Sequence, residues 1–197
     1  ASGTSAPDST EAGPSVLYYV MPYEPGRTLR DRLVQHGPLP AQEVVSILRD
    51  VCEALAHAHQ HGIVHCDIKP ENVLLSGTSA LIADFGVAQA VREARADDAR
   101  ALAGVAPGTR AYMAPEQAAN DPGMDHRADI YSVGTLAHEL LTGRLPSEQA
   151  GARGGRGLPS ADAARHLNGR PDVPRALVDL VTRCLELRPA DRFQSAE

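Results

Sequence analysis

Three short polar motifs, in a fixed order along the chain, constrain the fold more than any other feature. They are HCDIKPEN at 65–72, DFG at 84–86 and GTRAYMAPE at 108–116. Apolar runs at 63–64, 73–75 and 81–83 are separated by polar residues and glycine, which predicts short strands or turns joined by functional loops. One DFG alone would be uninformative, but all three motifs in this order form a specific signal.

The order of these motifs resembles the catalytic loop, DFG and APE segments of protein kinases. The wording HCDIKPEN, YMAPEQ and RPADRF is most similar to bacterial members of the eukaryotic-like (Hanks-type) serine/threonine protein kinases. The resemblance implies an α+β, protein-kinase-like fold, with a mainly α-helical C-lobe and a remnant strand of the N-lobe. It also implies a transferase that moves the γ-phosphoryl group of ATP to Ser or Thr of protein substrates.

Phosphoryl transfer requires positioned charge and metal more than covalent help from the protein. By resemblance, Asp67 accepts the proton of the substrate hydroxyl or orients that hydroxyl for attack, and Lys69 places positive charge against the γ-phosphate. Asn72 and Asp84 would offer hard oxygen ligands to Mg²⁺. Thr109, in the peptide-binding segment, completes the expected catalytic set and, with Lys69, points to Ser/Thr specificity.

The resemblance extends to the adenine site. Residues 16–24 are similar to the last N-lobe strand and the hinge, with Met21 as gatekeeper. Adenine would then bond to the carbonyl of Pro22 and the N–H of Glu24, where proline is harmless because only its carbonyl is used. Leu74 would form the apolar floor. The expected nucleotide-binding residues are Met21, Pro22, Glu24, Lys69, Asn72, Leu74 and Asp84.

The expected organisation follows the same resemblance. Residues 1–15 are small and polar and are expected to form a flexible N-terminal end, before the strand and hinge at 16–24. Residues 25–197 would form the C-lobe, with the catalytic loop at 65–72 and the activation segment at 84–116. The sequence contains no Gly-rich phosphate loop and no V-A-x-K strand, so it resembles a truncated kinase domain. An inactive lobe fragment or a pseudokinase-like binding module is the alternative.

One departure from the family concerns activation. Cys66 stands before Asp67, where most members have an Arg that reads a phosphate on the activation loop. Residues 87–113 contain no serine, and their only hydroxyl residues are Thr109 and Tyr112. We therefore expect a non-RD kinase whose loop is not switched by phosphorylation in the usual way.

Apolar spacing predicts the helices of the framework. Thr28 is expected to cap a short helix over 29–35, and longer helices are expected over 40–61, 129–142 and 176–187. The residues expected to face the core are Ile130, Val133, Leu136 and Leu140 in the second long helix, and Leu177, Leu180, Val181 and Cys184 in the third. By resemblance, Glu116 and Arg192 form a buried ion pair, and Asp129 holds the backbone of the catalytic loop.

Composition narrows the class of protein further. The chain has 19 basic and 25 acidic residues, a net charge of −6, which argues against nucleic acid as a partner. The longest apolar stretch, 16–21, is far shorter than the roughly 20 residues that span a bilayer. Three cysteines without a CxxC pair favour a reducing, cytoplasmic setting. A membrane anchor and regulatory or sensor regions outside this chain stay open.

Four histidines, at 57, 59, 61 and 65, raise the question of a metal site. Zinc needs further well-placed ligands and outer partners that orient them. Histidines at the end of a helix also interact favourably with its dipole, and we interpret the first three in this way. His65 is expected to have a structural role in the catalytic loop.

Overall fold

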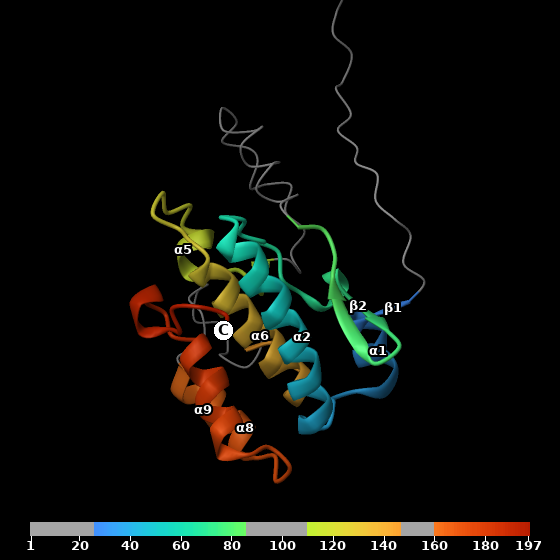
Figure 1. Cartoon of the computed structure of the whole chain (residues 1–197). Coiled ribbons are helices and arrows are strands. Elements are labelled where there is room, and N and C mark those ends of the chain that lie inside the picture. Colours follow the sequence, from blue (N-terminus) through green and yellow to red (C-terminus); the bar gives the residue numbers. More distant parts are fainter. Residues whose placement is uncertain (1–25, 86–109, 147–159) are drawn as a thin grey trace, which may run out of the picture.

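The computed structural model describes residues 26–85, 110–146 and 160–197 (Figure 1). Several expectations therefore lie outside the described residues: the N-terminal end at 1–15, the strand and hinge at 16–24, and residues 86–109 of the expected activation segment, which include Thr109.

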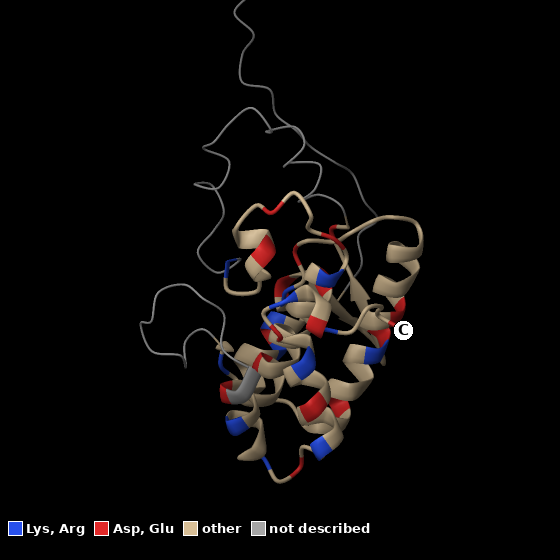
Figure 2. Cartoon of the chain, turned by 90° about the vertical axis from the view of Figure 1, so that its left-hand side faces the viewer, with Lys and Arg blue, Asp and Glu red and all other residues tan. Residues whose placement is uncertain are grey.

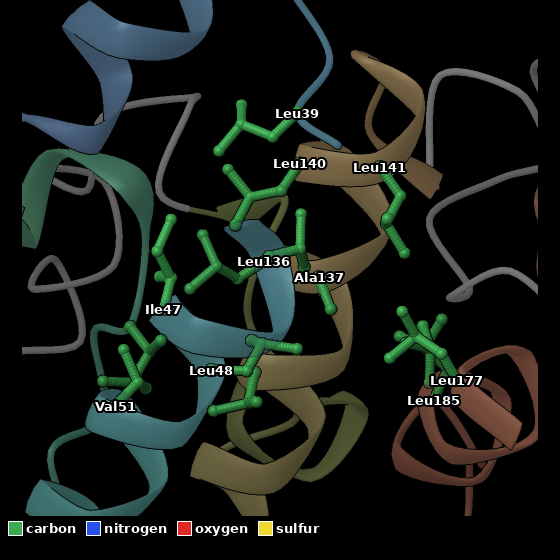
Figure 3. Close-up of a cluster of buried hydrophobic side chains, with 14 of the residues drawn as sticks. Leu39, Ile47, Leu48, Val51, Leu136, Ala137, Leu140, Leu141, Leu177 and Leu185 are labelled. Atoms are coloured by element: carbon green, nitrogen blue, oxygen red, sulfur yellow. The ribbon is translucent and has the colours of Figure 1, made fainter. Parts of the chain in front are cut away.

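Two long helices form the centre of the molecule. Helix α2 (Ala41–Gln60) lies beside helix α6 (Arg127–Thr142) (Figure 1). The bounds of both helices agree with the predicted ones to within two residues at each end. Leu48 of α2 and Leu136 of α6 belong to the same cluster of buried side chains (Figure 3). Burying one such leucine stabilises the fold by about 2 kcal/mol.

Helix α6 differs from its predicted form in one respect. The spacing predicted a single inward face, whereas every residue from Ala128 to Leu141 is buried. The helix is enclosed by its neighbours, so its polar positions are buried too and require partners inside the protein. These buried polar residues are Asp129, Ser132, Thr135, His138 and Glu139. The helix ends at Gly143, whose φ of 71° is the left-handed conformation that favours glycine.

Helix α1 (Leu29–His36) begins with the predicted cap at Thr28. The Thr28 hydroxyl accepts a hydrogen bond of 3.1 Å from the N–H of Asp31. The Asp31 carboxylate in turn accepts one of 3.1 Å from the N–H of Thr28. This reciprocal arrangement satisfies two N–H groups that the first turn leaves unpaired, and such a cap is worth about 1 kcal/mol.

A small antiparallel sheet, in the order β1-β2-β3, lies against α2. Its strands are β1 (Arg27–Thr28), β2 (Val73–Ser76) and β3 (Ser79–Ile82). Of the three apolar runs for which short strands or turns were expected, those at 73–75 and 81–83 fall in or overlap β2 and β3, and the run at 63–64 forms no strand. Because side chains alternate along a strand, Val73 and Ala80 pack into the core, and Leu74 and its partner Leu81 lie on the opposite face.

The C-terminal part comprises α5 (Pro115–Ala118), α8 (Ser160–Asn168) and α9 (Arg175–Cys184), with a short 3₁₀ turn at Pro189–Asp191. Another 3₁₀ turn, Pro70–Asn72, lies directly before β2. In α9 the predicted inward position of Leu180 is wrong, because its side chain is 42% exposed. The buried stripe passes instead through Leu177, Val178 and Val181, which rotates the inner face away from Leu180.

Helices α6 and α9 approach closely at Gly134. A Cβ atom there would lie 2.7 Å from the Cβ of Cys184, so only glycine fits without a shift of backbone.

Figure 2 shows basic and acidic residues interleaved along the described elements in that view. Among the described residues, no helix combines the length and the apolar character that a membrane crossing requires.

Candidate active site

Three of the predicted catalytic side chains meet in the loop between α2 and β2. The Lys69 ammonium group donates a hydrogen bond of 2.8 Å to Oδ2 of Asp67. The amide nitrogen of Asn72 donates one of 3.0 Å to the same oxygen and another of 2.8 Å to the backbone carbonyl of Asp67. Among the described residues, none donates a hydrogen bond to Oδ1 of Asp67. Within this part of the chain, the carboxylate is therefore fixed through one oxygen only.

The backbone of this loop is held by Asp129, as the resemblance predicted. Its fully buried carboxylate accepts hydrogen bonds of 2.8 Å from the N–H of His65 and 2.8 Å from the N–H of Cys66. Cys66 has a φ of 65°, a conformation that non-glycine residues adopt rarely. His59 contacts the same carboxylate, with Nε2 2.8 Å from Oδ2. This gives one of the four histidines a specific partner that the sequence did not predict.

His65 links the loop to the residue that follows β3. Its Nδ1 atom accepts a hydrogen bond of 3.2 Å from the N–H of Asp67, so Nε2 carries the proton of the neutral ring. Nε2 then donates to the carbonyl of Ala83 at 2.9 Å. The side-chain amide of Gln117, in α5, adds a bond of 2.6 Å to the carbonyl of Cys66. The structural role expected for His65 is visible in these contacts.

The β2–β3 hairpin places Asn72 and Asp84 at one end. Val73 pairs with Ile82, so the residue before β2 faces the residues after β3. The bond of 2.9 Å from the N–H of Ala83 to the carbonyl of Asn72 closes this end. Asp84, the next residue, has a φ of 64°, which is the left-handed conformation. The pairing of the two strands thus places Asn72 and Asp84 at the same end of the hairpin.

The chemistry of this pair fits Mg²⁺. Because the amide nitrogen of Asn72 is committed to Asp67, a cation would meet the amide oxygen. Together with the carboxylate of Asp84 this is a set of hard oxygen donors, which Mg²⁺ prefers, usually with waters and phosphates as the remaining ligands. Leu74 lies on the sheet face that points away from the core, next to Leu81, which is exposed. That face offers an apolar surface beside the donors.

Met21, Pro22, Glu24 and Thr109 lie outside the described residues. The structure brings together Asp67, Lys69 and Asn72, and sets Asp84 and Leu74 at the adjoining hairpin.

The ion pair predicted between Glu116 and Arg192 is confirmed. The guanidinium donates to both carboxylate oxygens of Glu116, at 2.6 and 2.9 Å, and is fully buried. It also donates to the backbone carbonyls of Arg127, Glu186 and Leu187. The APE segment is thereby tied both to the start of α6 and to the turn after α9.

The sequence did not predict a cluster of hydrogen-bonded polar side chains around Arg30, next to the catalytic loop. Arg30 of α1 donates to Glu71 and Glu139, and to the hydroxyl of Tyr112, which itself donates to Glu139. Burial and the hydrogen bond to Glu139 raise the pKa of Tyr112, so it is a neutral donor. Burial alone would lower the pKa of Arg30, but its bonds to Glu139 and Glu71 outweigh that and raise it.

Comparison with known proteins agrees with this geometry. The chain matches the protein kinase domain over residues 8–197. It is 37% identical over 196 residues to the serine/threonine-protein kinase PknB of Mycobacterium leprae, covering 95% of this chain and 30% of PknB. It is 41% identical over 182 residues to the serine/threonine-protein kinase PknL of Mycobacterium tuberculosis, covering 91% of this chain and 44% of PknL. The chain thus spans less than half the length of these relatives.

Sequence and structure agree on the family of this chain. The observations are the geometry of the catalytic loop, the hairpin that follows it, the buried Glu116–Arg192 pair and the match over nearly all residues. The relatives are bacterial, in agreement with the resemblance of the motifs to Hanks-type kinases. The chain belongs to the protein kinase family.

Proposed function

We propose that this chain carries the catalytic centre of a serine/threonine protein kinase, which transfers the γ-phosphoryl group of ATP to a protein hydroxyl. The observation that carries the proposal is the state of Asp67. Its Oδ2 atom is held by Lys69 and Asn72 at 2.8 and 3.0 Å, whereas no described residue donates to Oδ1, which can accept a hydrogen bond from a substrate.

Each residue then has a part in the transfer. The hydroxyl of the substrate donates to Asp67, and its oxygen attacks the γ-phosphorus in line with the bond to the leaving ADP. As the new P–O bond forms and the old one breaks, the hydroxyl proton passes to Asp67. Lys69, held beside Asp67, places its charge next to the transferred group. Asp129 and His65 keep the loop in this conformation.

The nucleotide would be held by residues from both ends of the site. Asn72 and Asp84 would ligate Mg²⁺, which neutralises phosphate charge when bound. Leu74 would support the adenine ring from below, on the face of the sheet that points away from the core. Met21, Pro22 and Glu24 would form the gatekeeper and hinge, and Thr109 would contact the substrate near the transferred group.

The wider setting of the protein is part of the proposal. We place the hinge strand at 16–24 after a flexible end at 1–15, and the C-lobe at 25–197. Partners would be proteins with Ser or Thr acceptors, and sensor or anchoring regions would lie outside this chain, whose relatives are much longer. The three cysteines form no disulfide, which supports the cytoplasm as its location.

The test separates nucleotide binding from transfer, using the protein that contains this chain. Wild type is expected to bind ATP more tightly with Mg²⁺ than without it. In Asp84→Asn, the affinity for ATP in the presence of Mg²⁺ should be lower by about tenfold or more, because the gain from Mg²⁺ is lost. Asp179→Asn, a surface change on α9, serves as the control. Mg²⁺-dependent binding without transfer to any protein would favour the alternative, a pseudokinase-like binding module.

A further inference from the structure

A single guanidinium group joins three separate segments next to the catalytic loop. Nε of Arg30 lies 2.8 Å from Oε1 of Glu71, and Nη1 lies 2.8 Å from Oε1 of Glu139. Nη2 donates to the hydroxyl of Tyr112 at 2.6 Å. Each of the three nitrogens therefore has its own acceptor. The acceptors together form a site whose shape and charge match a guanidinium group.

The two carboxylates of this site differ in exposure. The side chain of Glu139 is 6% exposed, and both of its oxygens are used, one by Arg30 and one by Tyr112. The side chain of Glu71 is 46% exposed and that of Arg30 is 28% exposed. The site therefore opens to solvent on the side of Glu71. A side chain of another molecule could reach it from there if Arg30 were absent.

The opening borders the place where a substrate must bind. Glu71 follows Asp67 by four residues of the catalytic loop, a length of chain that spans at most about 14 Å. Tyr112 belongs to the segment that the family resemblance assigns to peptide binding. In an extended peptide, residues two or three positions from the acceptor hydroxyl lie roughly 7–10 Å away from it. Their side chains can reach the same distance from Asp67 as Glu71.

We propose that Arg30 is a specificity-determining residue. It fills, from within the chain, a guanidinium site on the peptide-binding surface, and so prevents the selection of substrates with arginine there. This rests on the proposed kinase function. Without Arg30 the cluster has two carboxylates and no cation, and Glu139 is buried with an unpaired charge. An arginine supplied by the peptide would then restore the missing contacts.

The same helix offers a matched control. Arg32, also in α1, forms an ion pair of 3.1 Å with Glu43 of α2. Its side chain is about as exposed as that of Arg30, and its removal changes the net charge equally. The Arg32 pair involves neither the catalytic loop nor the segment around Tyr112. A change seen with Arg30→Ala and absent from Arg32→Ala is therefore due to the site and not to overall charge.

The experiment uses paired peptides with one central serine, identical except for arginine or alanine at a single flanking position. Binding to wild type, Arg30→Ala and Arg32→Ala is measured by fluorescence anisotropy, and transfer of labelled phosphate is measured in parallel. We expect wild type and Arg32→Ala to bind the two peptides of each pair alike. Arg30→Ala should prefer arginine at one position by about tenfold or more, because it supplies a charge pair that is partly buried.

Two further variants guard against misfolding and against indirect effects. Arg30→Gln keeps hydrogen-bond donors without the charge, and its preference for arginine should lie between those of wild type and Arg30→Ala. Adding Glu71→Gln to Arg30→Ala should remove most of the gained preference, because Glu71 is on the open side of the site. Thermal unfolding of each variant shows whether it is folded at the temperature of the assay.

The outcomes are distinct. A folded Arg30→Ala that binds both peptides of every pair alike would overturn the role of Arg30, as would an equal gain in Arg32→Ala. If wild type transfers phosphate to no peptide, the proposed function fails. The anisotropy data still decide the role of Arg30 in that case, since they do not depend on transfer.

Discussion

The carboxylate of Asp129 accepts a hydrogen bond of 2.8 Å from the backbone N–H of Cys66, a residue whose φ of 65° is rare outside glycine. The same carboxylate holds the N–H of His65 and contacts His59. A non-glycine residue in the left-handed conformation costs free energy and persists only where contacts around it compensate for that cost. The conformation of the catalytic loop, and with it the position of Asp67, therefore depends on a charged group on helix α6.

We predict that Asp129→Asn lowers the free energy of unfolding by about 3 kcal/mol, since a buried carboxylate with several donors is replaced by an amide that accepts on one side only. Transfer activity should fall with it, because the loop loses an anchor. Urea denaturation measures the first effect. Asp125→Asn, on the partly exposed Asp125–Arg127 pair, is the control and should cost less than about 1 kcal/mol. Equal losses for both variants would contradict the anchoring role.

The Glu116–Arg192 pair leads to a second prediction. Arg192 is fully buried and bonds to two carboxylate oxygens and three carbonyls, so Arg192→Lys cannot replace its contacts. We expect a loss of about 3 kcal/mol or more in unfolding free energy. Arg175→Ala removes an exposed pair in α9, with Asp179 at 3.6 Å, and should change stability by less than about 0.5 kcal/mol. Wild-type stability in Arg192→Lys would show that the pair contributes only charge.

Features with local signals could be predicted from the sequence alone. The cap at Thr28 depends on residues within four positions, so the residue type of Thr28 suffices to predict it, whereas the reciprocal bond to Asp31 was not predicted. Gly143 is a further case, since glycine at the end of an apolar period indicates a left-handed cap. The wrong inward position of Leu180 shows where local signals end. The spacing of apolar residues identifies an apolar face of a helix, but packing against α6 and α8 decides how that face is rotated.

The catalytic set could be predicted for another reason. Asp67, Lys69, Asn72 and Asp84 belong to motifs whose order resembles a known family, and the structure brings the first three into contact. The cluster around Arg30 could not be predicted in this way. Arg30 and Glu139 are separated by 109 positions, and neither lies in one of the three motifs. The contact between His59 and Asp129 spans 70 positions and has no periodic signal either.

A third prediction concerns pH. His138 is buried in α6, and burial lowers its pKa from 6.5 to about 4, an effect that the nearby ring of His166 reinforces. The unfolded chain therefore takes up a proton below pH 6.5 that the folded protein refuses until about pH 4. Stability contributed by the neutral ring is present above this window and is lost as the pH falls through it.

We expect His138 to account for a fall of about 2 kcal/mol in unfolding free energy between pH 7 and pH 5. The measurement compares wild type with His138→Phe by urea denaturation at both values, because the other histidines titrate in both proteins. The variant loses the bond of 3.1 Å to the carbonyl of Arg144, so its stability at neutral pH is not the readout. The same decline in both proteins would assign the pH dependence to other groups.

The most direct test of the proposed chemistry is phosphoryl transfer by the protein that contains this chain, with and without Asp67→Asn. Asp67 is partly exposed, and among the described residues its hydrogen bonds are to residues of its own loop, so the variant is expected to fold and to bind ATP normally. Loss of the carboxylate should reduce transfer of labelled phosphate to a protein acceptor by about a hundredfold or more. Transfer at the wild-type rate by Asp67→Asn would contradict the account, because its central carboxylate would then take no part in the reaction.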